Sequence, residues 1–396
     1  MILRNCRLVP ALVDDFSEST ADVVIEEGRI IGITPTGDRP AAADDLDLDG
    51  RWLLPGLIDL HVHLYLPNGN FDTLERRSHA DVIIDVIEHA QARLMYGYTT
   101  VRDCGASGFA NSAVRDAVKR GVVMGPTIFS SGRIISPTTR GNSITQSVYV
   151  EADGVDAVVR ACREEIAHGA DFIKYMATGS IANPGGEPGM MITTEAELVA
   201  LVESARLQNS YVAAHCHGKE GIIAAARAGV RTIEHASFLD DEAIKVLLDY
   251  GTAIVPTMSV AHSALARAAA NEGAHGIDDE QIKSFFDACR EGVKNAYEAG
   301  VPVAWGTDFG LSGLRKFGNV EFTLRKAFGF TPEELLRQAT IDSAQILGIQ
   351  DDVGSIAVGK LADLIVVERN PLEDIDVMVA APQMVFAKGV LAGLGR

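Results

Sequence analysis

Short runs of apolar residues alternate along this chain with longer segments in which apolar residues recur every three or four positions. The short runs predict buried strands, and the three-to-four spacing predicts helices that bury one face. A helix is further indicated by Thr194, which lies three residues before Glu197 and can form a capping box with it. We expect eight buried strands, at 57–63, 98–103, 127–132, 171–177, 210–217, 230–235, 252–257 and 301–308.

Eight strands that are each followed by a helix are the repeating unit of a (β/α)8 TIM barrel, which needs about 250 residues. Residues 55–351 fit that length. The two ends of the chain differ from this pattern, because residues 21–35 and 353–375 alternate and turn like β-hairpins. Neither end is long enough to bury a core alone. We therefore expect residues 1–54 and 352–396 to form one small discontinuous β-sandwich domain.

Composition and charge narrow the class of protein. The 396 residues carry a formal net charge of −19 without a basic stripe, which argues against a nucleic-acid partner. No apolar run reaches the roughly 18 residues that span a bilayer, and the first residues lack the pattern of a secretory signal. The five cysteines are scattered, as is typical of reduced thiols. We therefore expect a cytoplasmic protein without a membrane partner.

Two imidazoles in the first predicted strand need an explanation. His61 and His63 lie at positions i and i+2 of "PGLIDLHVHL", so they point to the same face of the strand. In barrels of this class the side chains at the carboxyl ends of the strands build the active site. The pair is compatible with hydrogen-bonded core histidines, but it also has the spacing of two ligands for one metal ion.

Four further residues of ligand type lie in later strands. His215 ends the fifth predicted strand, His235 the sixth and Asp308 the eighth. Lys174 lies within the fourth, where a buried ammonium is costly unless its charge is paired or removed. One solution is an ion pair or a side chain that reaches solvent. Another is reaction of the neutral amine with carbon dioxide, which gives an anionic carbamate that can bridge two metal ions. Each residue alone has a structural explanation, but the combination predicts a metal centre.

These residues lie in motifs that resemble those of the amidohydrolase superfamily, in its binuclear subtype with a carboxylated lysine. The motifs cover nearly the whole chain. They are "PGLIDLHVHL" (55–64), "IKYMATG" (173–179), "AAHCHG" (213–218), "TIEHAS" (232–237), "WGTDFG" (305–310) and "GSIAVGKLADLIVVERNPLEDI" (354–375). Within the superfamily, "GYTTVRDCG" and "TIEHASFLDDEA" are most similar to the imidazolonepropionase-related enzymes, which include Xaa-Pro dipeptidases and carboxypeptidases.

The resemblance implies two divalent metal ions, most often zinc, and a set of ligands for them. The more buried ion would be held by His61, His63 and Asp308. The other ion would be held by His215 and His235. Lys174, converted by carbon dioxide to N6-carboxylysine, would bridge both ions together with a hydroxide.

The resemblance further implies an enzyme, a metal-dependent hydrolase that cleaves C–N bonds of dipeptides, N-acyl amino acids or similar linear amides through the bridging hydroxide. The same centre would also suit a carbamate, lactone, cyclic amide, phosphotriester or toxin amide, and this alternative stays open. A catalytically silent assembly protein is a remote alternative, because such relatives lose metal ligands that this chain keeps. The relatives also lead us to expect a homo-oligomer that acts on small molecules.

Two residues are expected to take part in the reaction itself. Asp308 would accept a proton from the hydroxide and deliver it to the leaving amine. His217, two positions beyond His215, would donate to the developing oxyanion and contact the substrate, although several related peptidases carry Tyr there. Tyr175, beside Lys174 in the sequence, is also expected to contact the substrate.

Loops are expected to complete the substrate site. Arg140 lies in "SPTTRGN" (136–142), where related peptidases carry a Gly-Gly-His stretch. Its guanidinium could bind a substrate carboxylate as a bidentate pair, or it could be a solvent-facing loop residue. Residues 179–191 are rich in glycine and proline and predict a long loop over the site. Beneath the site, we expect Arg102 and Asp103 to form an ion pair.

Overall fold

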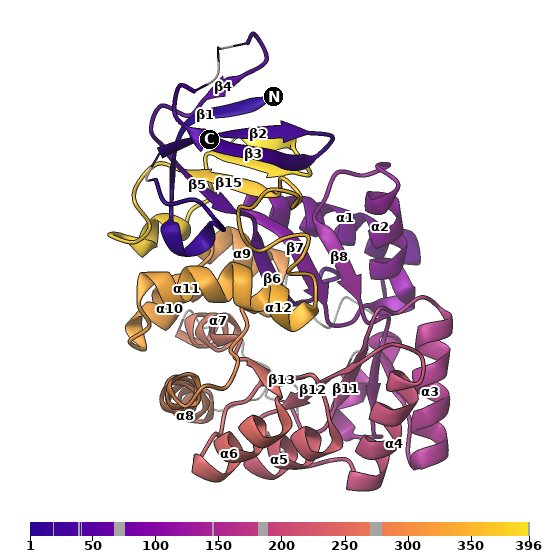
Figure 1. Cartoon of the computed structure of the whole chain (residues 1–396). Coiled ribbons are helices and arrows are strands. Elements are labelled where there is room, and N and C mark those ends of the chain that lie inside the picture. The colour runs from indigo at the N-terminus through magenta and orange to yellow at the C-terminus, as the bar shows by residue number, and fades with distance from the viewer. Residues whose placement is uncertain are drawn as a thin grey trace.

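The computed structural model describes residues 1–18, 20–38, 40, 42–66, 76–144, 146–180, 189–269 and 279–394. Both ends of the chain meet in one sheet at the top of Figure 1, and the central part of the chain forms an α/β body below it. Within the described ranges, no helix combines the length and the apolar character that a membrane span requires.

The sheet at the chain ends contains strands from both halves of the sequence. Its strands are β1 (Ile2–Leu8), β2 (Thr20–Glu26), β3 (Arg29–Pro35), β4 (Leu46–Asp47), β5 (Trp52–Pro55), β15 (Leu364–Val367), β16 (Met384–Ala387) and β17 (Val390–Leu394). The order is β17-β16-β15-β5-β1-β2-β3, with β4 paired to β1. Leu53 of β5 lies opposite Val366 of β15, and this antiparallel pairing joins the two ends of the chain. Both residues belong to a buried cluster with Leu3 and Phe386, so the sheet has a hydrophobic core of its own.

The body contains two parallel sheets. The first has the order β6 (Leu57–Val62), β7 (Tyr98–Asp103) and β8 (Thr127–Ser130). The second has the order β10 (Tyr149–Glu151), β9 (Ile134–Ser136), β11 (Ile173–Met176), β12 (Val212–Cys216), β13 (Thr232–His235) and β14 (Ala253–Val255). Seven of the eight predicted strands therefore occur at their predicted places. Strands β9 and β10 were not expected; β9 follows Gly132, whose φ of +70° interrupts the third predicted strand.

The eighth predicted strand, 301–308, is a single parallel bridge at Val303 to β14 rather than a regular strand. The prediction of a full strand is wrong here, because part of the backbone bonds to side chains instead. Thr307 N donates to Asp59 Oδ1 at 3.1 Å, so this amide is not available for backbone hydrogen bonds to a neighbouring strand. The segment nevertheless lies beside β6, since the Trp305 carbonyl accepts from a β6 backbone amide at 2.9 Å.

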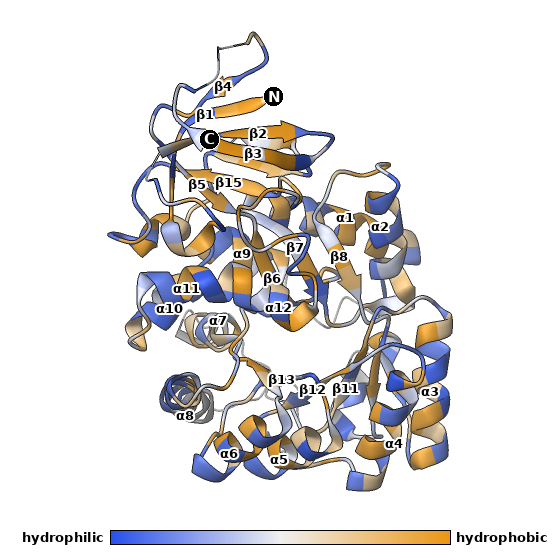
Figure 2. Cartoon of the chain, viewed as in Figure 1, coloured by the Kyte–Doolittle hydropathy of each residue, from blue (hydrophilic) through white to orange (hydrophobic). Residues whose placement is uncertain are grey.

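Helices alternate with the parallel strands and cover them. They are α1 (His79–Met95), α2 (Ala110–Lys119), α3 (Val155–Ala167), α4 (Glu195–Arg206), α5 (Lys219–Ala228), α6 (Asp241–Tyr250), α7 (Met258–Ala269), α8 (Asp279–Glu298), α9 (Leu311–Phe317), α10 (Glu321–Ala327), α11 (Pro332–Arg337) and α12 (Ser343–Leu347). The predicted capping box of Thr194 and Glu197 begins α4 and is confirmed. In Figure 2 helices such as α6 carry hydrophilic and hydrophobic residues, and the buried residues of α6 are among its apolar ones. The fold is therefore α/β with parallel sheets.

The end sheet generates a prediction about pH. Asp363, just before β15, is buried and accepts from Lys388 N at 2.6 Å. Burial raises the pKa of its carboxyl from 3.8 to about 6. Because the folded pKa lies above the unfolded one, this group stabilises the fold most below pH 3.8, and the contribution is lost as the pH rises through about 6. The shift corresponds to about 3 kcal/mol.

Asn at position 363 keeps the acceptor and does not titrate. We therefore expect the stability advantage of Asp363→Asn over the natural chain to be largest near pH 7.5 and to shrink by up to about 3 kcal/mol near pH 4. Urea unfolding at both pH values measures this difference, and Asp49→Asn at an exposed position is the matched control. An advantage that stays constant across this range would contradict the assignment.

Candidate metal centre

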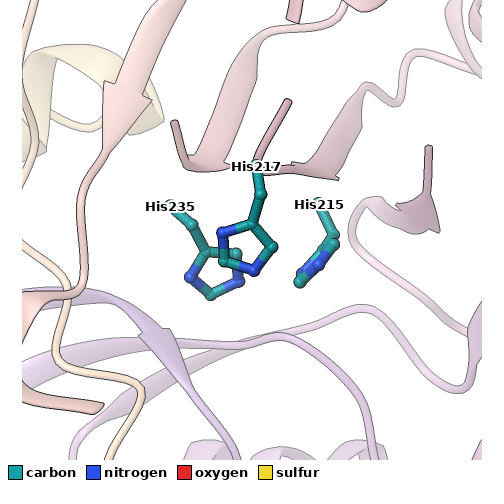
Figure 3. Close-up of side chains that lie close together, drawn as sticks. All are labelled: His215, His217 and His235. Carbon is teal, nitrogen blue, oxygen red and sulfur yellow. The ribbon is translucent and has the colours of Figure 1, made fainter. Parts of the chain in front are cut away.

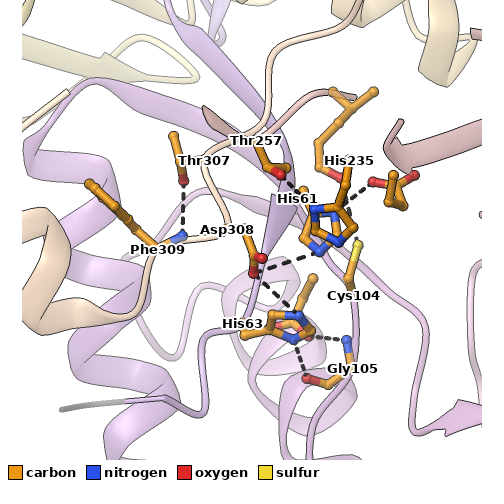
Figure 4. A network of polar contacts seen from close by, with 12 residues as sticks. His61, His63, Cys104, Gly105, His235, Thr257, Thr307, Asp308 and Phe309 are labelled. Atoms are coloured by element: carbon orange, nitrogen blue, oxygen red, sulfur yellow. Dashed lines mark hydrogen bonds and ion pairs between the residues drawn. The ribbon is translucent and has the colours of Figure 1, made fainter. Parts of the chain in front are cut away.

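The end of β6 brings two imidazoles to one place. His61 is buried and donates from Nδ1 to Glu234 Oε2 at 2.6 Å. His63 donates from Nδ1 to the Gly105 carbonyl at 3.2 Å. Both partners only accept hydrogen bonds, so each ring carries its proton on Nδ1 and keeps the Nε2 lone pair available. The Nε2 atoms of His61 and His63 lie 3.7 and 3.6 Å from Asp308 Oδ1. Figure 4 draws both contacts as dashed lines.

Asp308 is positioned by its backbone. Its amide donates to the His61 carbonyl at 2.8 Å, and its φ of +53° is in the left-handed region that Asp tolerates better than most residues. Burial raises the pKa of its carboxyl to about 7. His61, His63 and Asp308 thus form one group whose ligand atoms all lie within 4.8 Å of one another.

A second group consists of His215 from the end of β12, His217 just after it, and His235 from the end of β13. Their ligand atoms also lie within 4.8 Å of one another. The ring centroids of His217 and His235 are 4.8 Å apart in a stacked arrangement, and His215 is 4.5 Å from His235 (Figure 3). Nδ1 of His217 bonds to Ser237 Oγ at 2.8 Å, and Nδ1 of His235 bonds to Thr257 Oγ1 at 2.6 Å. These hydroxyls orient both rings.

The two groups adjoin, because the ring centroids of His61 and His235 are 5.0 Å apart. Lys174 on β11 is close to both. Its side chain is 2% exposed, and Nζ has no hydrogen-bond partner in the described part of the chain. Burial first, and the positive charge of Lys174 in addition, lower the pKa values of all five histidines of the two groups.

The histidines of the centre are therefore neutral at pH 7. The pKa is lowered to about 4 for His63 and to about 3 for His217. Neutral imidazole is the form that binds a metal ion. Imidazole and carboxylate ligands suit Zn²⁺, with Mn²⁺, Fe²⁺ or Co²⁺ as further candidates.

The polar atoms that lack a partner fit such ions. His215 Nε2 and Lys174 Nζ are both buried without a hydrogen-bond partner among the described residues. A cation would satisfy the first, and a carbamate oxygen pair on the second would turn a buried positive charge into a metal ligand. The residues present are therefore compatible with two ions and a carboxylated lysine.

A third group of ligand types, His61, Cys104 and Glu234, also lies within 4.8 Å. It is a poor set of ligands for two reasons. The Nδ1 of His61 is already occupied by its bond to Glu234. Burial raises the pKa of the Cys104 thiol, so the thiolate that binds metals is disfavoured.

Two buried ion pairs support the candidate metal ligands through hydrogen bonds. Arg102 Nη2 donates to Glu234 Oε1 at 2.6 Å, and Glu234 in turn accepts from His61. Asp59 accepts from Arg93 Nη1 at 2.7 Å and from Thr307 Oγ1 at 2.6 Å. The sequence interpretation missed the role of Glu234, although a carboxylate in the apolar run "TIEH" is as unusual as Lys174 in its strand.

The expected ion pair between Arg102 and Asp103 is wrong. Consecutive residues of a strand face opposite sides, so the two side chains of β7 diverge. Arg102 reaches Glu234, while Asp103 accepts from Leu64 N at 2.8 Å and from Gly105 N at 3.0 Å. Asp103 therefore supports the backbone around His63 rather than neutralising Arg102.

Of the residues expected to contact the substrate, Tyr175 is buried and Arg140 is exposed. Tyr175 is fully buried, and its hydroxyl bonds to Thr193 Oγ1 at 2.6 Å just before α4, so it packs between strand and helix. Arg140 begins a 3₁₀ segment (Arg140–Ile144) after β9, and its side chain is exposed. Of the predicted loop, residues 181–188 lie outside the described residues; its two ends meet where Gly179 N donates to the Met190 carbonyl at 2.9 Å.

Known proteins resemble this chain in sequence and in fold. Residues 52–393 match the family model described as "Amidohydrolase family". Ochratoxinase of Aspergillus niger is 32% identical over 351 residues, which cover 82% of this chain and 72% of that protein. Imidazolonepropionase of Shewanella oneidensis is 26% identical, covering 87% of this chain and 85% of its own. A solved Xaa-Pro dipeptidase with methionine bound in its active site has a TM-score of 0.88 and 28% identity, covering 100% of this chain and 99% of the other.

The buried pair of Asp59 and Arg93 generates a prediction about stability. Asp59→Ala leaves the Arg93 guanidinium buried without its carboxylate, so the free energy of unfolding should fall by about 3–5 kcal/mol. The double variant Asp59→Ala/Arg93→Met removes the stranded charge and should recover part of that loss. Urea unfolding of the four proteins of this cycle measures both effects. Additive losses in the double variant would show that the pair does not interact.

Proposed function

Because the chain belongs to the amidohydrolase family, we propose that the centre described above is the active site of a binuclear, metal-dependent hydrolase of amide bonds. The observation that carries the proposal is the buried Lys174 amine beside two groups of metal-ligand side chains. The substrates are dipeptides, N-acyl amino acids or similar linear amides. The likeness to a Xaa-Pro dipeptidase over the full chain supports this class.

We propose that residues 55–351 form a (β/α)8 barrel and that residues 1–54 and 352–396 together form a small discontinuous β-sandwich domain. Two sets of bonds support a barrel. On one side Ala304 N donates to the Ile254 carbonyl of β14 at 2.9 Å, and the Trp305 carbonyl accepts from Leu60 N of β6 at 2.9 Å, so the segment 301–308 bonds to both strands. On the other side Asp171 N donates to the Ser130 carbonyl at 2.7 Å, which links β8 to the segment before β11. The ligands then lie together at the carboxyl ends of the strands.

Each ion would have its own set of ligands. His61, His63 and Asp308 would hold the first ion, and His215 and His235 would hold the second. Lys174 would contribute to both sites once its neutral amine had added to carbon dioxide and lost one proton, which leaves an anionic carbamate with two oxygens. Two divalent ions bound in this way supply a water of lowered pKa and a Lewis acid for the substrate carbonyl.

Two side chains of the chain move or donate protons in this scheme. Asp308 lies beside the Nε2 atoms of both His61 and His63, where it accepts the proton of the attacking water and returns it to the leaving amine. His217 donates from Nε2 to the oxyanion when the Ser237 hydroxyl donates to its Nδ1. Asp308 acts as a general base and acid, and His217 acts as a hydrogen-bond donor. Both side chains must therefore lie within hydrogen-bond reach of the substrate.

The exposed Arg140 follows β9 at the same end of the strands and pairs with a substrate carboxylate. Tyr175 is not included among the substrate residues, because its hydroxyl is bonded to Thr193 on the far side of β11. The cytoplasmic location, the homo-oligomeric state and zinc as the physiological metal stay predictions.

A second candidate substrate is a toxin amide. The observation that favours it is the 32% identity to ochratoxinase over 82% of this chain. It changes the substrate but not the centre or the type of bond. Carbamates, lactones, cyclic amides and phosphotriesters are the controls that separate amide hydrolysis from the other chemistries of such a site.

The proposed function is tested by a hydrolysis screen on the zinc-loaded chain. We expect turnover of N-acyl amino acids or dipeptides, and of ochratoxin if the second candidate holds, that exceeds turnover of the control substrates. Release of free amino acid is the readout, with the metal-depleted chain as the blank. Turnover of lactones or phosphotriesters alone would contradict amide hydrolysis.

Lys174→Ala tests the bridging role. The variant removes the bridging ligand, so we expect the content of tightly bound divalent ions to fall from about two to one or fewer per chain, with loss of turnover. Metal analysis after gel filtration gives the content, and added formate or acetate should restore part of the activity by supplying carboxylate oxygens. Lys294→Ala on α8 is the control. Two retained ions with full activity in Lys174→Ala would refute the carbamate.

Arg140→Ala tests carboxylate recognition. If the guanidinium binds a substrate carboxylate, the variant should raise KM for substrates with a free carboxylate by about tenfold or more, since a charge-assisted hydrogen bond is worth about 1.5–3 kcal/mol. KM for the matching carboxamides should change little. Steady-state kinetics on acid and amide pairs measure the difference, and equal changes for both would dismiss the role.

A further inference from the structure

The carboxylate of Glu234 has no part in the scheme above, although it lies directly behind a proposed metal ligand. Glu234 is fully buried on β13. Its Oε2 accepts from His61 Nδ1 at 2.6 Å, and its Oε1 accepts from Arg102 Nη2 at 2.6 Å. Thr232 Oγ1 donates to the same Oε1 at 2.5 Å. A buried carboxylate is costly unless it is paired and hydrogen-bonded, and here a guanidinium, a hydroxyl and an imidazole N–H all donate to it.

The backbone explains how Glu234 and His235 both serve one centre. Side chains of consecutive strand residues point to opposite faces. The φ of His235 is +72°, so the chain turns at the end of β13 and redirects this ring towards the centre. Glu234, one position earlier, faces His61 across the space between β13 and β6.

Arg102 fixes this carboxylate and the strand that carries His61 at once. Its Nε donates to the carbonyl of Leu60, the residue before His61, at 2.6 Å. Its Nη1 donates to Thr232 Oγ1 at 3.0 Å. Arg102 Nη2 and the Thr232 hydroxyl both donate to Oε1 of Glu234, and the guanidinium charge beside it favours the ionised carboxylate. Oε2 is then an acceptor for His61 Nδ1.

We propose that Glu234, held by Arg102, is a positioning residue that keeps His61 protonated on Nδ1 and aims its Nε2 lone pair at the first ion. The inference rests on the proposed function in one respect, that His61 is a metal ligand. A carboxylate behind a ligating imidazole fixes its tautomer and orientation and makes it a stronger donor to the metal. His63, whose partner is the neutral Gly105 carbonyl at 3.2 Å, lacks this effect.

The substitution Glu234→Gln separates this role from packing. Glutamine has nearly the same shape but one acceptor and one donor. If its oxygen serves Arg102, its NH2 faces His61 Nδ1 and forces the ring proton onto Nε2, the atom that binds the ion. In Glu234→Gln/Arg102→Met the amide oxygen is released from the guanidinium and is able to accept from His61 Nδ1 again. The double variant should therefore recover part of the affinity that the single variant loses.

The experiment measures zinc affinity of the full, metal-depleted chain by competition with a chromophoric chelator. We expect Glu234→Gln to weaken the first site by about 10- to 100-fold, the usual effect of losing such a partner. Glu321→Gln is the matched control, because Glu321 is an equally buried partner of Arg325, with Arg325 Nε to Glu321 Oε1 at 2.7 Å. Its other described bonds are to Met258 and Ser259, and none is to a proposed ligand of the first ion. This control should lower the melting temperature without changing zinc affinity.

Each outcome decides the inference. Zinc affinity of Glu234→Gln equal to that of the natural chain overturns it, and so does an equal loss in Glu321→Gln, because the effect would then come from stability. A natural chain that binds no zinc overturns the proposed function itself. Where Glu234→Gln does not fold, Thr232→Val removes one donor to the carboxylate and should give a smaller loss in the same assay; an unchanged affinity there overturns the inference.

Discussion

An amine buried without a partner constrains the whole centre. Lys174 Nζ lies in the interior beside neutral histidines, and no described residue offers it a hydrogen bond. Its positive charge also lowers the pKa values of the imidazoles around it. An unmodified, charged lysine therefore disfavours any further positive charge among these side chains. In the proposed function, a carbamate on this nitrogen would reverse the sign of the charge, and neutral imidazoles beside an anion would attract cations. This one chemical change would turn an unfavourable cluster into a site for two ions.

Buried ion pairs next to the centre hold its side chains and backbone in position. Arg93 with Asp59 and Arg102 with Glu234 are fully buried pairs that link β6 to α1, β7 and β13. Buried pairs of this kind add little net stability compared with apolar packing, but removing one partner is expensive. Here the pairs hold backbone amides and imidazoles in place. They link the fold to the proposed chemistry, because the positions of His61 and Asp308 depend on them.

Much of this organisation is predictable from the sequence, for physical reasons that differ from element to element. The strands were predicted at the right places because they are short apolar runs between helical segments. The amidohydrolase family and its Xaa-Pro dipeptidase relatives were identified because polar residues in those runs form motifs. The prediction of a regular strand at 301–308 was wrong because Thr307 N bonds to a side chain instead of to a neighbouring strand. The pairing of Arg102 with Glu234 was missed because the two residues are far apart in sequence and meet only in the folded sheet.

In the proposed function, Lys174 carries a carbamate between two ions. The most direct measurement is a crystal structure of the chain grown with zinc and bicarbonate, with diffraction data collected on both sides of the zinc absorption edge. We expect two anomalous peaks, one beside His61, His63 and Asp308 and one beside His215 and His235, with density for a carboxylate on Lys174 Nζ. An unmodified Lys174 side chain with no anomalous peak beside these histidines would contradict it.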